Sequence, residues 1–182
     1  MDSMYLQQVI WITGLSGSGK TTTARILSKV LTGRGFKVIH LDGDELRAAL
    51  INIDTMGSYD KASRLKNSYI YASLASSFAQ QADFVIVSTI SMFEELYRSN
   101  RRNIEKYFEV FLDVPEEIRK IRDKKNIYLA VDGEKSKDVC GVNLGVDIPK
   151  LSNFKYEFKE SDKPQDVSSK VILALESWCP IT

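Results

Sequence analysis

The chain has few of the residues that build metal centres and disulfide frameworks. It contains one histidine, His40, and two cysteines, Cys140 and Cys179, among 182 residues. A single histidine excludes a histidine-rich metal site, and the two distant cysteines match no metal-binding spacing. His40 ends a predicted strand, where we expect a structural role. We interpret the two thiols as incidental residues of a cytoplasmic chain.

A charge of one sign and long apolar runs are also missing. Lysine and arginine number 25 and aspartate and glutamate 24, so the net charge is only +1. Without a broad field, we expect no binding to nucleic acid or to an anionic membrane, and any anion must be bound in a local site. No stretch approaches the roughly 20 apolar residues that span a bilayer. We expect no signal peptide, because the N-terminus lacks its basic and apolar regions.

Short apolar runs that alternate with amphipathic segments are what the chain has instead. Strands are predicted at residues 9–12, 36–41, 84–87, 107–114 and 154–158. Helices are predicted after Pro115 and at residues 20–31, 44–51, 61–81, 92–106 and 164–178. In the longest helix, the apolar spacing predicts the inward residues Leu65, Tyr69, Ala72, Ala75 and Ala79. The alternation predicts one α/β domain over residues 1–182, with a doubly wound parallel five-stranded sheet.

Residues 14–21 read Gly-Leu-Ser-Gly-Ser-Gly-Lys-Thr, which matches the P-loop pattern in full. An apolar strand precedes this loop and an amphipathic helix follows it, as the pattern requires. Glycines allow a tight loop whose N–H groups point inward, and the helix N-terminus adds partial positive charge. We therefore predict a three-layer P-loop NTPase fold that binds a nucleoside triphosphate, with Lys20 at the β- and γ-phosphates and Thr21 on Mg²⁺. The expected binding residues are Gly14, Ser16, Gly17, Ser18, Gly19, Lys20, Thr21 and Thr22.

Other P-loop classes have sequence signals that are missing here. A GTPase usually carries an Asn-Lys-x-Asp motif, which the chain does not contain, and the Asp-x-x-Gly at residues 54–57 does not directly follow a strand. A motor or transport ATPase would have a hydrophobic strand that ends in aspartate, whereas the predicted strand at residues 84–87 is followed by Ser88. These absences favour a kinase that uses ATP.

Two acids follow the second predicted strand, in Leu41-Asp42-Gly43-Asp44. The carboxyl ends of parallel strands open onto the ligand crevice, where two carboxylates can hold metal-bound water and take a proton from an attacking hydroxyl. Arg47 lies one helical turn after Asp44 and can face the same crevice. A turn with a helix N-cap is the other interpretation, because aspartate suits both, and for Asp44 both can hold. The predicted catalytic residues are Lys20, Asp42 and Asp44.

The periodicity fades at residues 124–150, where charged residues, three glycines and Pro149 dominate. A mobile lid and a plain surface loop both explain this composition. We favour the lid, because an enzyme that transfers a phosphoryl group must exclude water during the reaction.

Several short motifs occur in a specific order along most of the chain. They are residues 11–21, residues 41–47, Arg64 with Asn67, Ile90-Ser91, residues 122–128 and residues 145–149. Together they resemble the adenylyl-sulfate kinase family, which phosphorylates the 3′-hydroxyl of adenosine 5′-phosphosulfate with Mg-ATP. The resemblance implies ATP and Mg²⁺ as cofactors and a small-molecule nucleotide as substrate. It also allows a homodimer, since related kinases are commonly dimers.

The resemblance assigns residues of this chain to the two substrates. It implies that Lys20 and Thr21 bind the ATP phosphates and Mg²⁺, and that Arg122 lies over the ATP adenine. Asp44, with Asp42 beside it, would be the base that accepts the proton of the acceptor hydroxyl. The residues implied for the acceptor side are Arg47, Arg64 and Asn67 near the 5′-phosphate, Tyr59, Ile90, Ser91 and Asn143 in the pocket, and Lys125 in the lid.

The departures from the family pattern concentrate in the acceptor pocket. Two arginines of the family's long helix are Tyr69 and Ile70 here, and Glu94 replaces a cation. Tyr59 stands for one of two phenylalanines that clamp the acceptor adenine, but Asn143 replaces the other and cannot stack as an aromatic ring can. Asn143 can instead hydrogen-bond a pyrimidine edge. The donor side is therefore close to the family and the acceptor side is altered.

Several functions stay open on this sequence. A kinase of adenylyl sulfate fits first, and a kinase of another nucleotide conjugate, such as the cytidine diphosphoramidate used in capsule modification, is the alternative. A regulatory module that binds nucleotide without catalysis is opposed by the intact Lys20, Thr21, Asp42 and Asp44. In a kinase of a sugar or an antibiotic, Arg47, Arg64 and Asn67 would bind some other anion.

Overall fold

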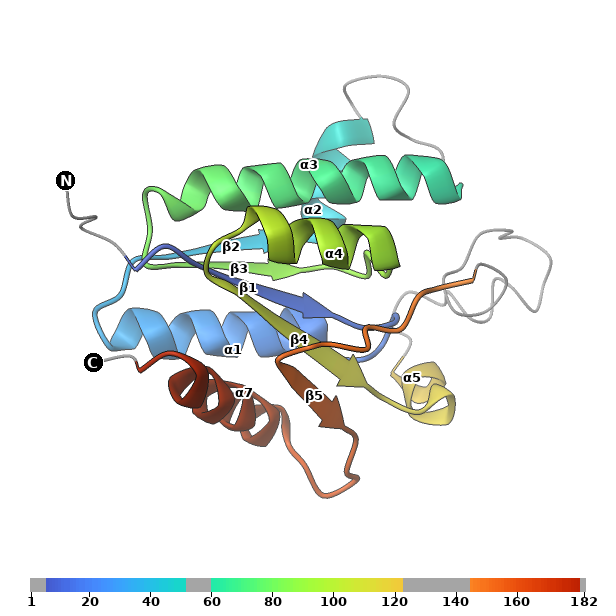
Figure 1. Ribbon diagram of the computed structural model, residues 1–182. Helices are drawn as coiled ribbons and strands as arrows, with labels where there is room; N and C mark the ends of the chain where they lie inside the picture. Colours follow the sequence, from blue (N-terminus) through green and yellow to red (C-terminus); the bar gives the residue numbers. More distant parts are fainter. Residues whose placement is uncertain (1–5, 52–59, 123–144, 181–182) are drawn as a thin grey trace.

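Five parallel strands form the centre of the fold in the computed structural model, which describes residues 6–51, 60–122 and 145–180 (Figure 1). The strands are β1 (Gln8–Thr13), β2 (Val38–Asp42), β3 (Phe84–Ser88), β4 (Tyr107–Asp113) and β5 (Phe154–Glu157). Their order in the sheet is β2-β3-β1-β4-β5, and every neighbouring pair is parallel. The predicted doubly wound sheet is confirmed.

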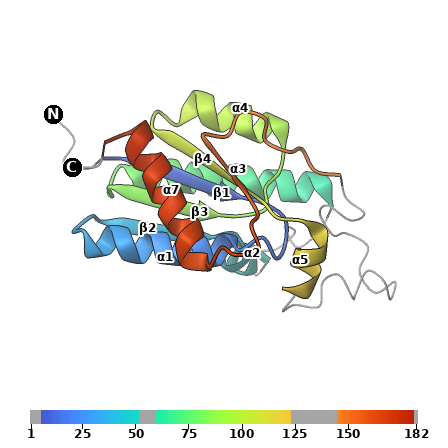
Figure 2. The same ribbon diagram turned by 90° about the horizontal axis from the view of Figure 1, so that it is seen from below.

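Helices cover both faces of the sheet, which gives the predicted three layers (Figures 1 and 2). α1 (Lys20–Gly33) and α7 (Pro164–Trp178) pack on one face, and α3 (Lys61–Ala79) and α4 (Glu94–Asn103) pack on the other. Alternate residues of β1 serve the two layers, because Ile10 packs toward α1 and α7 whereas Trp11 packs toward α3 and α4. A strand covered on both faces is apolar on both sides, which explains the apolar runs in the sequence.

The carboxyl ends of β1, β2 and β3 meet at one edge of the sheet. The register pairs Asp42 of β2 with Ser88 of β3, and Ser88 with Ile12 of β1. α2 (Gly43–Ile51) begins directly after β2, and α5 (Glu116–Ile121) lies shortly after β4. This topology brings the P-loop and the two acids of the sequence together.

The long helix α3 is predicted correctly, but one residue of its inward face is wrong. Ala75 is buried as expected, whereas Tyr69 is 36% exposed. Tyr71 points inward instead and is only 4% exposed. Tyr71 and Ala75 lie four residues apart on one face, and Tyr69 lies about 200° around the helix axis from Tyr71. Asn67 and Ser68 continue the buried side, so the apolar spacing alone misplaced it.

The helix predicted at residues 92–106 is shorter in the structure. α4 begins at Glu94 because Phe93 has an extended backbone, with φ −133° and ψ 125°. Met92 and Phe93 are buried. The segment between β3 and α4 is therefore a loop, and its residues form one wall of a cleft.

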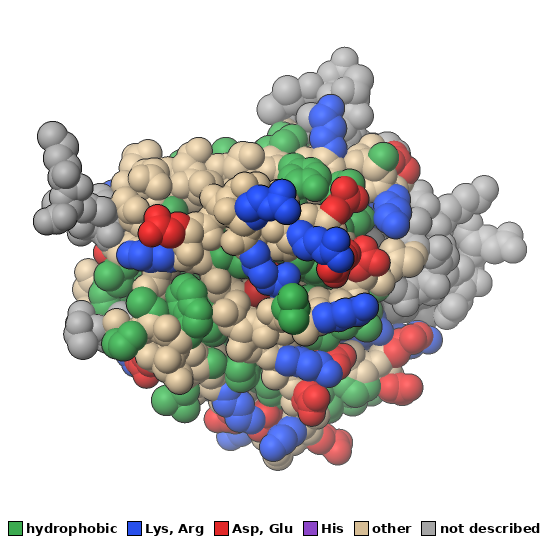
Figure 3. Space-filling model, in the orientation of Figure 1, with side chains coloured by type: hydrophobic (Ala, Val, Ile, Leu, Met, Phe, Trp, Pro, Cys, Tyr) green, Lys and Arg blue, Asp and Glu red, His purple; other side chains and the backbone are tan. Residues whose placement is uncertain are grey.

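Charged side chains of both signs share the surface. On the face shown in Figure 3, lysine and arginine side chains are interspersed with those of aspartate and glutamate. Some form exposed ion pairs, such as Arg98 with Glu94 at 2.9 Å and Lys120 with Glu116 at 2.9 Å. In the described part of the chain, no helix is both long and apolar enough to cross a bilayer.

Candidate active site

The P-loop follows β1 and is shaped by glycines that no other residue could replace without strain. Gly14 and Gly17 have φ values of 149° and 80°. A Cβ atom on Gly14 would lie 2.8 Å from the Leu112 carbonyl oxygen, and one on Gly17 would lie 2.7 Å from the Arg119 carbonyl oxygen. A Cβ atom at these distances would clash with the carbonyl oxygens, so at both glycines the loop packs directly against the backbone of β4 and α5. This contact fixes the loop in place.

Arg119 is a supporting residue that the sequence analysis missed. Its side chain is buried, with 5% exposed, and its Nε donates to the Val114 carbonyl oxygen at 3.0 Å. That bond ties α5 to Val114, the residue that directly follows β4, and α5 carries the backbone against which Gly17 rests. The helix after Pro115 was the only signal available, because nothing in sequence spacing relates Arg119 to residue 17.

Most of the predicted ATP-binding residues line one cleft. Lys20 Nζ donates to the Leu15 carbonyl oxygen at 2.8 Å, which holds the ammonium group at the loop. Gly14 and Ser18 are the buried members of the loop and do not line the cleft. The cleft-lining members of the predicted set are Ser16, Gly17, Gly19, Lys20, Thr21, Thr22 and Arg122.

Asp42 is held by a set of hydrogen bonds at the end of β2. Its Oδ2 accepts from Thr21 Oγ1 at 2.7 Å and from Ser88 Oγ at 2.9 Å, and its Oδ1 accepts from the Asp44 backbone N–H at 3.0 Å. The Thr21 bond links the P-loop helix α1 to β2. The turn-and-cap interpretation is therefore met by Asp42, whose carboxylate satisfies an N–H group in the first turn of α2.

These bonds also determine the charge of Asp42. Burial opposes ionisation, but the hydrogen bonds from Thr21, Ser88 and the backbone of Asp44 and Glu45 outweigh it and lower the pKa of Asp42. Hydrogen bonds to a carboxylate favour its charged form. Asp42 is thus an ionised carboxylate that hydrogen bonds hold beside the Thr21 hydroxyl.

His40 extends this network away from the cleft. Its Nε2 lies 2.9 Å from Ser88 Oγ, the hydroxyl that also donates to Asp42. Burial lowers the pKa of His40, although the Asp42 and Glu45 carboxylates oppose the shift. A lowered pKa keeps the ring neutral at neutral pH, so His40 can accept or donate one hydrogen bond there. The structural role expected for His40 agrees with this geometry.

Asp44 differs from Asp42 in its exposure to solvent. It lies in the first turn of α2, is exposed and lines the cleft. A carboxylate that is exposed at the cleft can meet a bound hydroxyl, whereas the Asp42 carboxylate is buried, with 5% exposed. The structure therefore distinguishes the two acids by their burial.

The side of the cleft that carries the predicted acceptor residues, here called the acceptor side, is built by α2, α3 and the loop after β3. α3 presents a polar stripe in which residues three or four apart share one face. Of the predicted acceptor residues, Arg47, Arg64, Asn67, Ile90 and Ser91 all line the cleft. Tyr59, Lys125 and Asn143 lie outside the described residues, so their roles stay predictions. The same holds for residues 124–144 of the expected lid.

Buried hydroxyl groups form the floor of this side, and the sequence analysis missed two of them. Ser91 Oγ lies 2.7 Å from Ser68 Oγ and 2.8 Å from Thr89 Oγ1. Ser68 Oγ also lies 2.8 Å from the Arg64 carbonyl oxygen. All three hydroxyls are buried and line the cleft. Ser68 directly precedes Tyr69, in the part of α3 that departs from the family pattern, which was the available signal.

The end of the expected lid segment docks on the start of α4. Asp147 Oδ2 accepts from the Glu94 backbone N–H at 3.0 Å, and the Asp147 N–H donates to the Met92 carbonyl oxygen at 3.0 Å. Val146 packs against the cluster that contains Met92 and Phe111. Asp147 thus caps α4, whose own N-cap residue offers no side-chain bond, and Val146 reaches the cleft.

Arg122 lies at the C-terminal end of α5, on the rim of the cleft. Its guanidinium carbon is 5.1 Å from the centre of the Phe158 ring. The planar cation is thereby held over an aromatic face. Phe158 was not predicted as part of this region, because it follows the last strand and is remote in sequence.

Comparison with known families identifies this arrangement. The adenylylsulphate kinase family model matches residues 6–157. The chain belongs to the adenylylsulphate kinase family.

Two curated relatives of this adenylylsulphate kinase family member carry different names. A cytidine diphosphoramidate kinase of Campylobacter jejuni is 38% identical over 143 residues, which cover 78% of this chain and 81% of that protein. A probable adenylyl-sulfate kinase of Archaeoglobus fulgidus is 33% identical over 159 residues, or 87% of this chain and 93% of that protein. The predicted family is confirmed, while the acceptor differs among its relatives.

A solved structure supports the same placement. The adenylylsulphate kinase of Mycobacterium tuberculosis, in complex with AMPPNP and APS, has a TM-score of 0.83 and 29% sequence identity to this chain. The match covers 93% of this chain and 97% of that one. The present family member is an ATP-dependent phosphotransferase, as the P-loop and the missing GTPase motif predicted, and of the nucleotide-conjugate kinase type, as the family resemblance implied.

Proposed function

We propose that this kinase transfers the γ-phosphoryl group of ATP to the 3′-hydroxyl of a 5′-nucleotide conjugate, with adenylyl sulfate as the first candidate. The observation that carries the proposal is one cleft lined by both the P-loop and the cations of α2 and α3. A triphosphate on the loop and an anionic acceptor on the helices would meet beside Asp44. The M. tuberculosis neighbour, solved with AMPPNP and APS together, supports the same pairing.

The residues near the loop fit Mg²⁺. Thr21 and Asp42 present oxygen atoms 2.7 Å apart, and Mg²⁺ prefers oxygen ligands. No cluster of three or more histidine, cysteine, aspartate or glutamate residues that could hold a metal occurs within residues 6–51, 60–122 and 145–180. A metal held by one or two side chains together with substrate phosphates is usual for Mg²⁺ in kinases. When bound, Mg²⁺ would neutralise charge on the β- and γ-phosphates.

In the proposed reaction Asp44 accepts the proton of the 3′-hydroxyl. A bond forms between the 3′-oxygen and the γ-phosphorus, and the bond from that phosphorus to the β–γ bridging oxygen breaks, so ADP leaves. Lys20 would stabilise the charge on the phosphates, and Arg47 and Arg64 would hold the acceptor. Such transfers depend mostly on positioning and charge stabilisation.

Cytidine diphosphoramidate is the second candidate acceptor. The C. jejuni relative named for this compound is 38% identical to the chain, which supports the alternative. The hydroxyls of Ser68, Thr89 and Ser91 give the acceptor side a polar floor. A hydrogen bond from Asn143 to a pyrimidine edge stays a prediction.

Turnover with both acceptors tests the proposal. Purified chain, ATP and Mg²⁺ are incubated with adenylyl sulfate or with cytidine diphosphoramidate, and ADP formation is compared with a blank that lacks acceptor. Faster turnover of adenylyl sulfate supports the first candidate, and the reverse result supports the second. A sugar and an aminoglycoside serve as further arms. The proposal fails if neither nucleotide conjugate raises ADP formation above the blank.

The cytoplasmic location stays a prediction. The homodimer stays a prediction, which the sedimentation behaviour of the purified chain would test.

A further inference from the structure

The cleft-facing stripe of α3 begins one turn before the residues already discussed. Lys61, Arg64 and Asn67 follow one another at intervals of three residues and all line the cleft. Residues three apart on a helix are neighbours on its surface. Burial increases along the stripe, because Lys61 is exposed, Arg64 is half-buried and Asn67 is 4% exposed. Lys61 therefore stands at the mouth of the cleft, above the two predicted acceptor residues.

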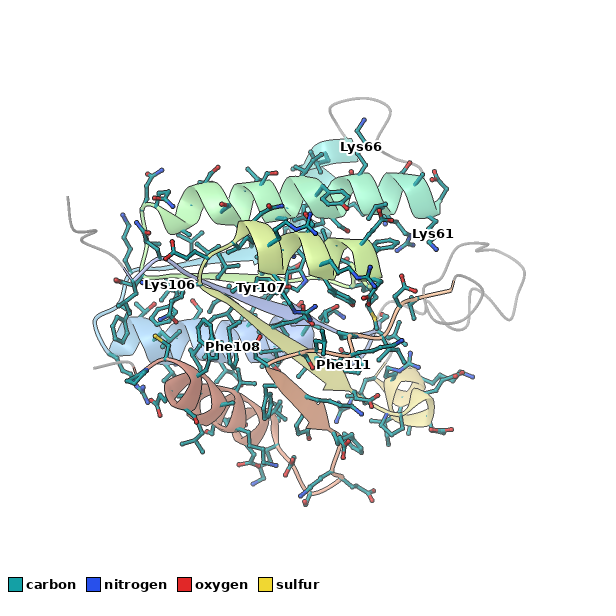
Figure 4. All side chains as sticks on the ribbon, in the orientation of Figure 1. Lys61, Lys66, Lys106, Tyr107, Phe108 and Phe111 are labelled. Carbon is teal, nitrogen blue, oxygen red and sulfur yellow. The ribbon has the colours of Figure 1, made fainter. Side chains whose placement is uncertain are left out.

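A second lysine of the same helix shows that this placement is specific. Lys66 is exposed but does not line the cleft. In Figure 4 the two labelled lysines of α3 leave the helix on different sides, Lys61 below the start of the helix and Lys66 above it. Only Lys61 lies on the side of the sheet and the cleft. The pair supplies a matched control within one helix.

Cationic side chains outnumber carboxylates on this side of the cleft. Arg47, Arg64 and Lys61 contribute three cations, and Asp44 contributes one carboxylate. Lys61 and Arg64 are separated by about 4.5 Å along the helix axis. At this spacing the two cations can contact two successive phosphate-sized groups of one ligand. Lysine acts on phosphate as a flexible point charge, which suits a position at the solvent edge.

We propose that Lys61 is a further acceptor-positioning residue, which contacts the second anionic group on the 5′ side of the acceptor. The inference rests on the proposed function and deepens it. Under this assignment the cleft selects nucleoside 5′-diphosphate-type conjugates over 5′-monophosphates, and Lys61 supplies much of that selection. Lys61 has no part in binding the donor.

Calorimetry on the whole chain tests the assignment. The donor side is saturated with AMPPNP and Mg²⁺, and AMP, ADP, CMP and CDP are titrated as acceptor-side probes. Wild type should bind the diphosphate of the accepted base more tightly than its monophosphate. Lys61→Ala should weaken diphosphate binding about threefold to tenfold and monophosphate binding less than about twofold. Lys61→Arg should retain the preference, and added salt should reduce it, since exposed charges are screened.

Lys66→Ala is the control and should behave as wild type with every probe. Kinetics with the true acceptor supply a second readout, in which Lys61→Ala raises the acceptor KM but leaves kcat and the ATP KM unchanged. If wild type binds the probes and Lys61→Ala binds them equally well, or loses ATP affinity instead, the inference is wrong while the proposed function stands. If wild type binds none of the probes and turns over no nucleotide conjugate, the proposed function fails and takes the inference with it.

Discussion

The donor and acceptor sides of the cleft are built by different means. On the donor side, backbone geometry dominates, because Gly14 and Gly17 adopt positive φ values and rest against the backbone of β4 and α5. On the acceptor side, side chains of α2, α3 and the loop after β3 form the surface. A loop that binds phosphates through its backbone suits any triphosphate and tolerates few substitutions. A surface made of side chains can change its binding properties through single substitutions. This contrast explains why the family is readable from the sequence and the acceptor is not.

Loss of the P-loop lysine should have the largest effect. We expect Lys20→Ala to lower kcat by about two to three orders of magnitude, on the scale of a lost preorganised charge contact. Steady-state kinetics with saturating ATP measure this. Lys29→Ala, an exposed lysine of the same helix α1, is the control and should retain activity. A Lys20→Ala enzyme with near-normal kcat would show that the donor side does not work through this cation.

Neutralising Asp44 should separate chemistry from donor binding. We expect Asp44→Asn to lower kcat about a hundredfold or more, because a general base contributes on that scale, while ATP affinity changes little. Single-turnover kinetics and calorimetry with AMPPNP measure the two quantities. Glu45→Gln, the neighbouring exposed acid, is the control. Near-normal kcat in Asp44→Asn would require another base.

Replacing an arginine on the acceptor side should weaken binding of the acceptor and leave binding of ATP unchanged. We expect Arg64→Ala to raise the acceptor KM about tenfold, since a charge-assisted hydrogen bond is lost, with the ATP KM unchanged. Arg102→Ala on the exposed surface of α4 is the control. Equal increases in both KM values would contradict the division of the cleft into two sides.

The lowered pKa of Asp42 predicts a smaller effect, which concerns how the stability of the fold depends on pH. Its pKa is lowered in the folded chain, so the unfolded chain takes up a proton at higher pH than the folded one. Asp42 therefore contributes stability that is complete above its ordinary pKa of 3.8 and is lost as pH falls through the folded-state pKa. Urea unfolding from about pH 6 to about pH 3 should show a flatter acid limb for Asp42→Asn. Glu160→Gln is the control, and parallel curves for Asp42→Asn and wild type would refute the shift.

The sequence predicts this fold well because strand and loop signals are local. The apolar run of β1, the glycines and Lys20 lie within one short segment, and their physical causes act between neighbours. The acceptor side is different, because Ser68, Thr89 and Ser91 come together only when α3 packs beside the end of β3. The error at Tyr69 has the same origin. Apolar spacing assigned it inward, yet this end of α3 turns polar residues toward the cleft.

The central claim is that ATP and an alcohol meet between the P-loop and Asp44. Phosphorus NMR of a reaction with ATP, Mg²⁺ and each nucleotide conjugate tests it most directly, because it reports where the phosphoryl group goes. We predict a new phosphomonoester signal, coupled to the 3′-proton of the ribose, that grows as ADP forms. Inorganic phosphate as the only product, or a phosphate on any other oxygen of the acceptor, would contradict the account.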